Sequence, residues 1–185
     1  MIGKLFSGKP SAAAATPEGE RLYAVGDIHG CAALLDVLLE KINADDAADG
    51  KKRRLIFLGD YVDRGGDSKG VIDRLMAIRA REPETIFLKG NHEQAVLDFL
   101  DDPNLNEDWL HWGGDKTLES YGIGGIWQKS PGALAEALAG LGDPRAARAG
   151  GAPRLHDLLC GGDRPARRSH DRRRRPDPVG RRPDR

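Results

Sequence analysis

Three short apolar runs alternate along the chain with longer segments in which apolar residues recur every three or four positions. The runs lie at 22–25, 55–58 and 85–88, and such nearly continuous runs are typical of strands in a parallel sheet. The segments after the first two runs begin near Cys31 and near Ser68, a good N-cap, and their spacing predicts helices. A repeat of about thirty residues predicts an α/β domain whose parallel strands alternate with helices.

The helical spacing also predicts which side chains face the core. For the first helix they are Leu34, Leu35, Leu38, Leu39 and Ile42. For the second they are Val71, Ile72, Leu75, Met76 and Ile78. A third helix carries apolar residues over 96–100 and ends before Pro103, a further helix starts near 106–108, and Gly113-Gly114 interrupts it. Ser130-Pro131 begins a last amphipathic stretch, which Gly142 ends.

Length and charge divide the chain into three parts. Its 185 residues suffice for one domain with a core, and we assign the domain to 20–143, after a disordered leader at 1–19. Residues 144–185 form a tail rich in arginine, proline and glycine that we expect to be disordered. The net charge of zero hides an asymmetry, because ten arginines and four aspartates lie within 161–185. No apolar run approaches the ~20 residues of a membrane helix, and the N-terminus has no secretory h-region, so we expect a cytoplasmic protein without a membrane partner.

Each predicted strand ends in a glycine that is followed by polar residues. The three sequences are GDIHG at 26–30, GDYVDRG at 59–65 and GNHE at 90–93. Because the carboxyl ends of parallel strands meet at one edge of a sheet, these loops should lie side by side. Carboxylate, imidazole and amide ligands together suit manganese, iron or zinc, and one carboxylate can bridge two ions. Arg64 offers a planar fork that matches phosphate oxygens.

These three motifs, in this order, resemble the calcineurin-like metallophosphoesterase family, and most of all its bacterial serine/threonine phosphoprotein phosphatase branch. The stretch WLHWGGDKTLESYG at 109–122 is similar to the same branch, and the resemblance covers roughly residues 21–125. It implies the N-terminal half of a metallophosphoesterase α/β sandwich. It also implies hydrolysis by direct attack of a metal-bound hydroxide on phosphorus, without a phosphoenzyme.

The resemblance further implies two divalent metal ions, with manganese as the expected metal and iron or zinc as alternatives. Asp27 and His29 would bind the first ion, and Asp60 would bridge both ions. Asn91 would bind the second ion and contact the substrate. The expected substrate is a phosphoprotein or a small phosphoester.

Catalysis would then rest on three neighbouring side chains. The resemblance implies that His92 donates a proton to the leaving oxygen, that Asp63 orients His92, and that Arg64 holds the phosphate. A dinucleoside tetraphosphate hydrolase is the alternative within the enzyme class, because such enzymes share the three motifs. The alternative from another class is a catalytically impaired remnant that binds metal or nucleic acid, although nucleic acid is the less favoured partner. The sequence gives no oligomeric state.

The chain departs from the family pattern after about residue 143. Family members complete the second metal site with two later histidines, one of them in a VHAG-like motif, and neither His156 nor His170 has the flanking residues of these motifs. The second metal site should therefore be half-liganded, and one face of the sheet should stay exposed. We interpret the tail as a frameshift or premature end, and its rival interpretation is a genuine basic tail.

Other residues near the motifs are assigned structural roles. Glu93 should be a helix N-terminal charge, and His111 should pack between two tryptophans. Cys31 should be a small buried residue. We expect the remaining large aromatic side chains of this region to be buried rather than to line a substrate surface: Trp109, Trp112, Trp127 and Tyr121.

Overall fold

A three-stranded parallel sheet forms the base of the molecule in the computed structural model, which describes residues 15–47 and 50–140. Its strands stand in the order β1 (Glu20–Val25), β2 (Lys52–Phe57) and β3 (Ile86–Phe87). Parallel pairing places the ends of all three strands at one edge, with Phe57 beside both Val25 and Phe87. The α/β class with parallel strands alternating with helices is thus confirmed. The predicted tail lies outside the described residues, as does the predicted leader apart from 15–19.

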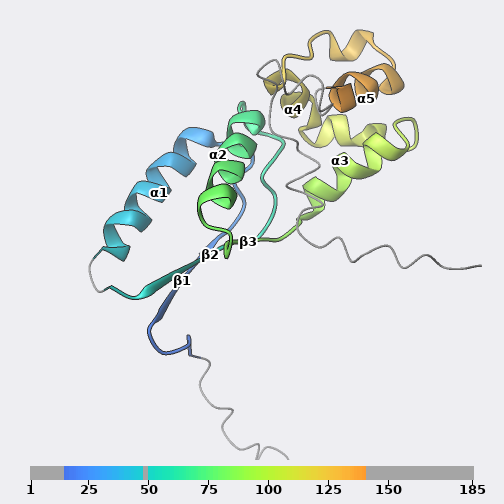
Figure 1. Ribbon diagram of the computed structural model, residues 1–185. Helices are drawn as coiled ribbons and strands as arrows, with labels where there is room; N and C mark the ends of the chain where they lie inside the picture. Colours follow the sequence, from blue (N-terminus) through green and yellow to red (C-terminus); the bar gives the residue numbers. More distant parts are fainter. Residues whose placement is uncertain (1–14, 48–49, 141–185) are drawn as a thin grey trace, which may run out of the picture.

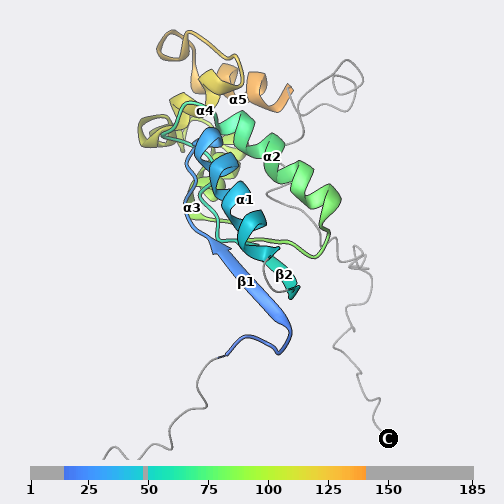
Figure 2. The same cartoon turned by 90° about the vertical axis from the view of Figure 1, so that its left-hand side faces the viewer.

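Helices follow each strand and then continue the chain beyond the sheet. Their bounds are α1 Ala32–Asp46, α2 Ser68–Arg81, α3 Asn91–Asp101, η1 Glu107–Trp112, α4 Gly114–Ser120, η2 Ile126–Gln128 and α5 Pro131–Gly140. In Figure 1, α1 and α2 lie side by side over one face of the sheet. The turned view in Figure 2 shows α3, α4 and α5 gathered beyond the arrowhead of β1. The helical group therefore lies at the strand ends where the polar motifs occur. No helix in the described ranges is long and apolar enough to cross a membrane.

Two helix boundaries differ from the sequence prediction. The N-cap of α2 is Asp67, whose side chain accepts a hydrogen bond of 2.8 Å from the Gly70 amide. Ser68 is already helical and fully buried, so its assignment as the cap was wrong. Gly113 does interrupt the chain, with a left-handed φ of 107°, but the short helix α4 that follows was not predicted.

The buried face of α1 is narrower than its leucine pattern indicates. Leu35 and Ile42 are buried and Leu39 is partly buried, as predicted. Leu34 and Leu38 are exposed, with Leu34 at 68%, so their predicted inward orientation was wrong. The helix contacts α2, and these two leucines lie outside the buried stripe of Ala32, Leu35 and Ile42. In α2 the prediction was better, because its Val, Leu and Ile residues are buried and Met76 is partly buried.

The two faces of the sheet differ in cover. Leu55 and Phe57 lie on the face of the sheet that the helices cover, and both are buried. The ring of Phe57 stacks on that of Phe87 with centroids 5.2 Å apart. Because side chains alternate along a strand, the opposite face carries Leu22 and Ile86, which are exposed. No described element covers this face, which agrees with the expectation that one face stays open.

Replacement of Ile86 by threonine should change the free energy of unfolding by less than ~0.5 kcal/mol, because the side chain is 45% exposed. It should also reduce self-association, since it removes apolar area from an open sheet face. Urea unfolding and light scattering measure the two effects. In the matched variant Leu55→Ala, a buried strand residue is truncated, which should cost about 2–5 kcal/mol. Equal destabilisation by both variants would show that the face of Ile86 is covered.

Candidate functional site

Backbone hydrogen bonds join the first two polar loops. The amides of Ile28 and His29 both donate to the Asp60 carbonyl at 2.9 Å, and the Gly30 amide donates to the Tyr61 carbonyl at 2.9 Å. These bonds fix the loop after β1 against the loop after β2. The convergence that parallel strand order predicts is therefore built into the backbone.

Backbone strain is concentrated in the same loops. Four non-glycine residues of the described part have a left-handed φ: His29 (43°), Asp60 (54°), Asp63 (72°) and Arg64 (66°). Such conformations cost on the order of 1–3 kcal/mol each and persist where the surroundings enforce them. All four residues belong to the predicted site, which is where stored strain commonly serves function.

The third loop approaches the second so closely that only glycine fits. A Cβ atom on Gly90 would lie 2.2 Å from Oδ1 of Asp60 and 2.6 Å from its amide nitrogen. The His92 amide donates to the same Oδ1 at 3.1 Å. The start of α3 is thus docked directly against the Asp60 side chain.

Glu93 holds these two loops together. Its buried carboxylate accepts hydrogen bonds from the amides of Gly90 (2.9 Å), Asp60 (2.7 Å) and Tyr61 (2.7 Å). It is the third residue of α3, and its bond to the Gly90 amide is the half of a capping box that a glutamate at this position supplies. The structural role expected for Glu93 agrees with this geometry, although the bonds to the second loop go beyond a helix-dipole effect.

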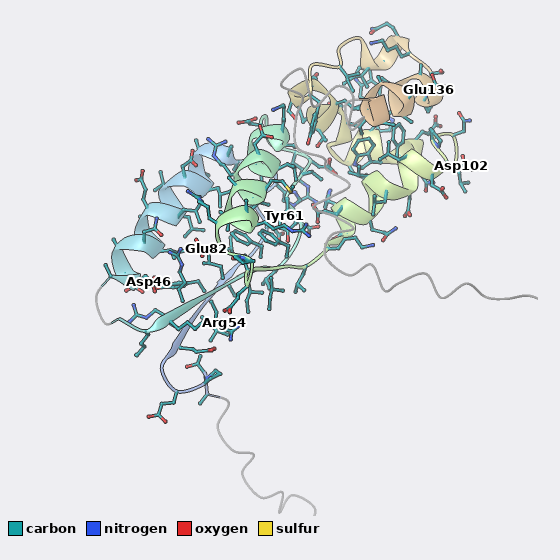
Figure 3. The ribbon with its side chains drawn as sticks, viewed as in Figure 1. Asp46, Arg54, Tyr61, Glu82, Asp102 and Glu136 are labelled. Carbon is teal, nitrogen blue, oxygen red and sulfur yellow. The ribbon has the colours of Figure 1, made fainter. Side chains whose placement is uncertain are left out.

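Tyr61, labelled in Figure 3, lies where the strands meet the loops. It is buried, and its hydroxyl donates to the Leu88 carbonyl at 2.6 Å. Burial, reinforced by the nearby Glu93 carboxylate, raises the pKa of this hydroxyl. Tyr61 therefore remains a hydrogen-bond donor that supports the site from beneath.

Asp27, His29 and Asp60 present three candidate metal ligands. Their ligand atoms all lie within 4.8 Å of one another. The Nδ1–H of His29 donates to the Val62 carbonyl at 2.8 Å, which leaves the Nε2 lone pair free, 3.9 Å from Oδ2 of Asp27. A backbone carbonyl that fixes the histidine tautomer in this way is the usual support of a metal-binding imidazole. Two carboxylates and one imidazole fit manganese, iron or zinc.

A buried pair, His92 and Asp63, stands next to these ligands. Nδ1 of His92 lies 2.8 Å from Oδ2 of Asp63, and both side chains are almost completely buried. Asp63 also accepts hydrogen bonds from Nε1 of Trp109 (2.8 Å) and from the Thr117 hydroxyl (2.7 Å). The structure thus brings together the two residues that the sequence paired. Sequence reasoning missed the two further donors, for which the only signal was the 109–122 stretch as a whole.

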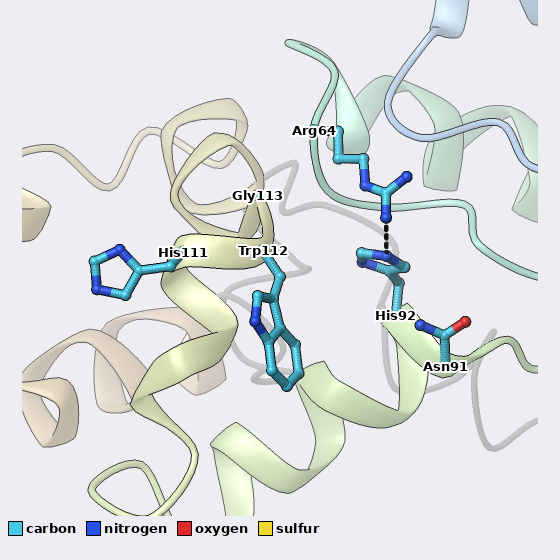
Figure 4. Close-up of a pocket in the computed structure, with 6 residues that line it drawn as sticks. All are labelled: Arg64, Asn91, His92, His111, Trp112 and Gly113. Carbon is cyan, nitrogen blue, oxygen red and sulfur yellow. Dashed lines mark hydrogen bonds between the residues drawn. The ribbon is translucent and has the colours of Figure 1, made fainter.

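Arg64 and Asn91 lie at the mouth of the site. Nη2 of Arg64 donates to Nε2 of His92 at 3.0 Å, as the dashed line in Figure 4 shows. Together with His92 they line a pocket of about 650 Å³, whose opposite wall is His111, Trp112 and Gly113. All seven sequence-predicted site residues therefore lie at one edge of the sheet.

Several aromatic side chains are placed differently from the prediction. Trp109 is buried as expected, but Trp112 and Trp127 are each 56% exposed, so burial was the wrong expectation for them. His111 is exposed and stacks on Trp127, with ring centroids 4.9 Å apart, and does not pack between Trp109 and Trp112. Cys31 is likewise exposed, contrary to its assignment as a small buried residue.

The profile of the calcineurin-like phosphoesterase family matches residues 20–161. The chain therefore belongs to this family of metallophosphoesterases, a class of hydrolases, as its three motifs indicated.

Two kinds of named relatives are similar to the chain. The chain is 42% identical over 76 residues to a symmetrical bis(5'-nucleosyl)-tetraphosphatase of Methylococcus capsulatus. This alignment covers 41% of the chain and 25% of the tetraphosphatase. It is 37% identical over 76 residues to the enzyme of the same name from Xanthomonas axonopodis pv. citri, and this alignment covers 41% of the chain and 22% of that enzyme. It is 37% identical over 94 residues to serine/threonine-protein phosphatase 1 of Salmonella typhimurium, and this alignment covers 51% of the chain and 39% of the phosphatase. The aligned part thus spans well under half the length of each relative.

Proposed function

We propose that the chain is a metal-dependent phosphomonoester hydrolase acting on phosphorylated serine or threonine in proteins. The observation that carries this proposal is the placement of Asp27, His29 and Asp60 beside the buried Asp63–His92 pair and Arg64. The wide pocket next to His92 supports a protein substrate. So does the similarity to the Salmonella phosphatase, whose alignment covers more of this chain than those of the tetraphosphatases do.

The carboxylate, imidazole and amide groups of the site determine which metal ions we propose. Asp27 and His29 would hold a first divalent ion, Asp60 would be shared between two ions, and Asn91 would contribute to the second. Manganese is the metal we propose. When bound, such ions activate water and neutralise charge on the phosphoryl oxygens. The cytoplasmic location and the half-liganded second site stay predictions.

His92 is proposed to protonate the leaving oxygen. Its Nδ1–H is held by Asp63, which fixes the ring and stabilises it when it carries a second proton. Its Nε2 faces the pocket and accepts from Arg64. A phosphate that draws the Arg64 guanidinium to its own oxygens would free Nε2 to carry the proton for the leaving group.

The variant His92→Asn tests this role through the leaving group. Loss of the proton donor should reduce kcat for a phosphoserine peptide by about 10²–10⁴-fold. The loss should be much smaller for p-nitrophenyl phosphate, because its leaving oxygen needs no proton. Steady-state kinetics with manganese on both substrates provides an internal control for folding and metal binding. Equal losses on the two substrates would contradict a proton-donor role.

A dinucleoside tetraphosphate hydrolase is the second candidate, and the match to the Methylococcus tetraphosphatase favours it. A comparison of kcat/KM for a phosphoserine peptide and for diadenosine tetraphosphate separates the two. The proposal expects the peptide to be the better substrate. A clear preference for the dinucleotide would replace it with the second candidate.

A further inference from the structure

An exposed indole stands in the wall of the pocket beside His92. Trp112 is 56% exposed and lines this pocket together with Arg64, Asn91 and His92. Within residues 15–47 and 50–140 no other aromatic ring stacks on it. Trp127 is equally exposed, but it already stacks on His111 and is not part of the pocket lining. A large apolar ring left open at this position is suited to cover a ligand.

Trp112 lines the same pocket as His92, the residue proposed to protonate the leaving group of the substrate. Figure 4 shows its indole on the side of the pocket that faces His92, with Asn91 beyond His92 and the ring of His111 pointing away from both. Nε2 of His92 marks where the leaving oxygen lies during proton transfer, and Arg64 marks the phosphate side. On the proposed roles of His92 and Arg64, the group attached to the leaving oxygen would share the pocket with Trp112.

We propose that Trp112 is a stacking platform for a planar aromatic ring in the leaving group of the substrate. This inference rests on the proposed metal-dependent phosphomonoester hydrolysis and extends its substrates beyond serine and threonine phosphates, whose leaving groups carry no aromatic ring. Offset stacking between aromatic rings favours binding by about two- to tenfold beyond the effect of buried area. The ring can belong to an aryl ester such as tyrosine phosphate or to the base of a nucleotide, and the two sources place it at different distances from phosphorus.

Equilibrium binding of non-hydrolysable ligands in the presence of manganese tests the platform without relying on turnover. The first pair is phenylphosphonate and cyclohexylphosphonate, which have equal carbon counts but differ in planarity. The second pair is α,β-methylene adenosine diphosphate and methylenediphosphonate, which differ by the nucleoside. Titration calorimetry on the 185-residue chain should show a preference of about twofold or more for the aromatic member of one pair. The pair that shows it identifies the source of the ring.

Three variants assign that preference to Trp112. Trp112→Ala should abolish it, Trp112→Phe should retain most of it, and Trp127→Ala should leave it unchanged. A preference that survives Trp112→Ala, or equal affinities within both pairs of ligands, would overturn the inference while leaving the phosphoryl site intact. Failure of all four ligands to bind the folded wild-type chain would contradict the proposed function and this inference together.

Discussion

Replacement of Asp60 by asparagine is expected to lower manganese-dependent hydrolysis of an aryl phosphate by about 10³-fold or more. Asp60 is the residue of the second loop that joins Asp27 and His29 in the ligand cluster, and the proposal shares its carboxylate between two ions. Removing its charge weakens both sites, and Lewis-acid stabilisation worth several kcal/mol corresponds to about three powers of ten in rate. The substitution preserves shape, because an asparagine oxygen can still accept the His92 amide hydrogen bond.

Asp67 provides the matched control for this experiment. It is an aspartate a few residues further along the chain that caps α2 and does not belong to the ligand cluster. Asp67→Asn keeps a good N-cap, so its activity should stay near that of the wild type. Wild-type activity in Asp60→Asn, measured with p-nitrophenyl phosphate at saturating manganese, would refute the shared role of this carboxylate.

Truncation of Glu93 to alanine is expected to destabilise the fold by about 3 kcal/mol or more. The change removes the acceptor of three amides, of which that of Tyr61 is buried and those of Gly90 and Asp60 are partly buried. Each buried unsatisfied group costs about 1–3 kcal/mol. Glu93→Gln keeps one acceptor oxygen and should lie between the wild type and alanine. Urea unfolding followed by circular dichroism measures all three proteins.

Glu119 serves as the control for Glu93. It is an exposed glutamate paired with Lys116 on α4, and removal of such a surface pair changes stability by less than ~1 kcal/mol. If Glu93→Ala and Glu119→Ala had the same unfolding midpoint, Glu93 would not be the link between the second and third loops.

The sheet, its first three helices and the position of the site could be predicted because they depend on local patterns. Apolar runs and helical spacing define the elements, and parallel strand order brings the three motifs to one edge. Asp27, His29, Asp60 and His92 could be placed in one site for this reason alone. The site prediction thus required no knowledge of side-chain packing.

Other features depend on contacts between distant segments and could not be read from local patterns. Trp109 and Thr117 reach Asp63 across 46 and 54 residues of sequence, and no spacing rule links them. The exposure of Leu34 depends on how much of α1 the sheet and α2 cover. The left-handed backbone of Asp63 likewise results from the packing of its loop, because the residue type alone does not require it.

Direct titration of the 185-residue chain with Mn²⁺ tests the central claim, that the loops after the strands form a metal site. The electron paramagnetic resonance signal of the free ion reports how much manganese the protein binds. The account predicts saturable binding by the wild type that is lost in Asp60→Asn and retained in Asp67→Asn. Absence of binding by the folded wild-type chain, or equal binding by Asp60→Asn, would contradict it.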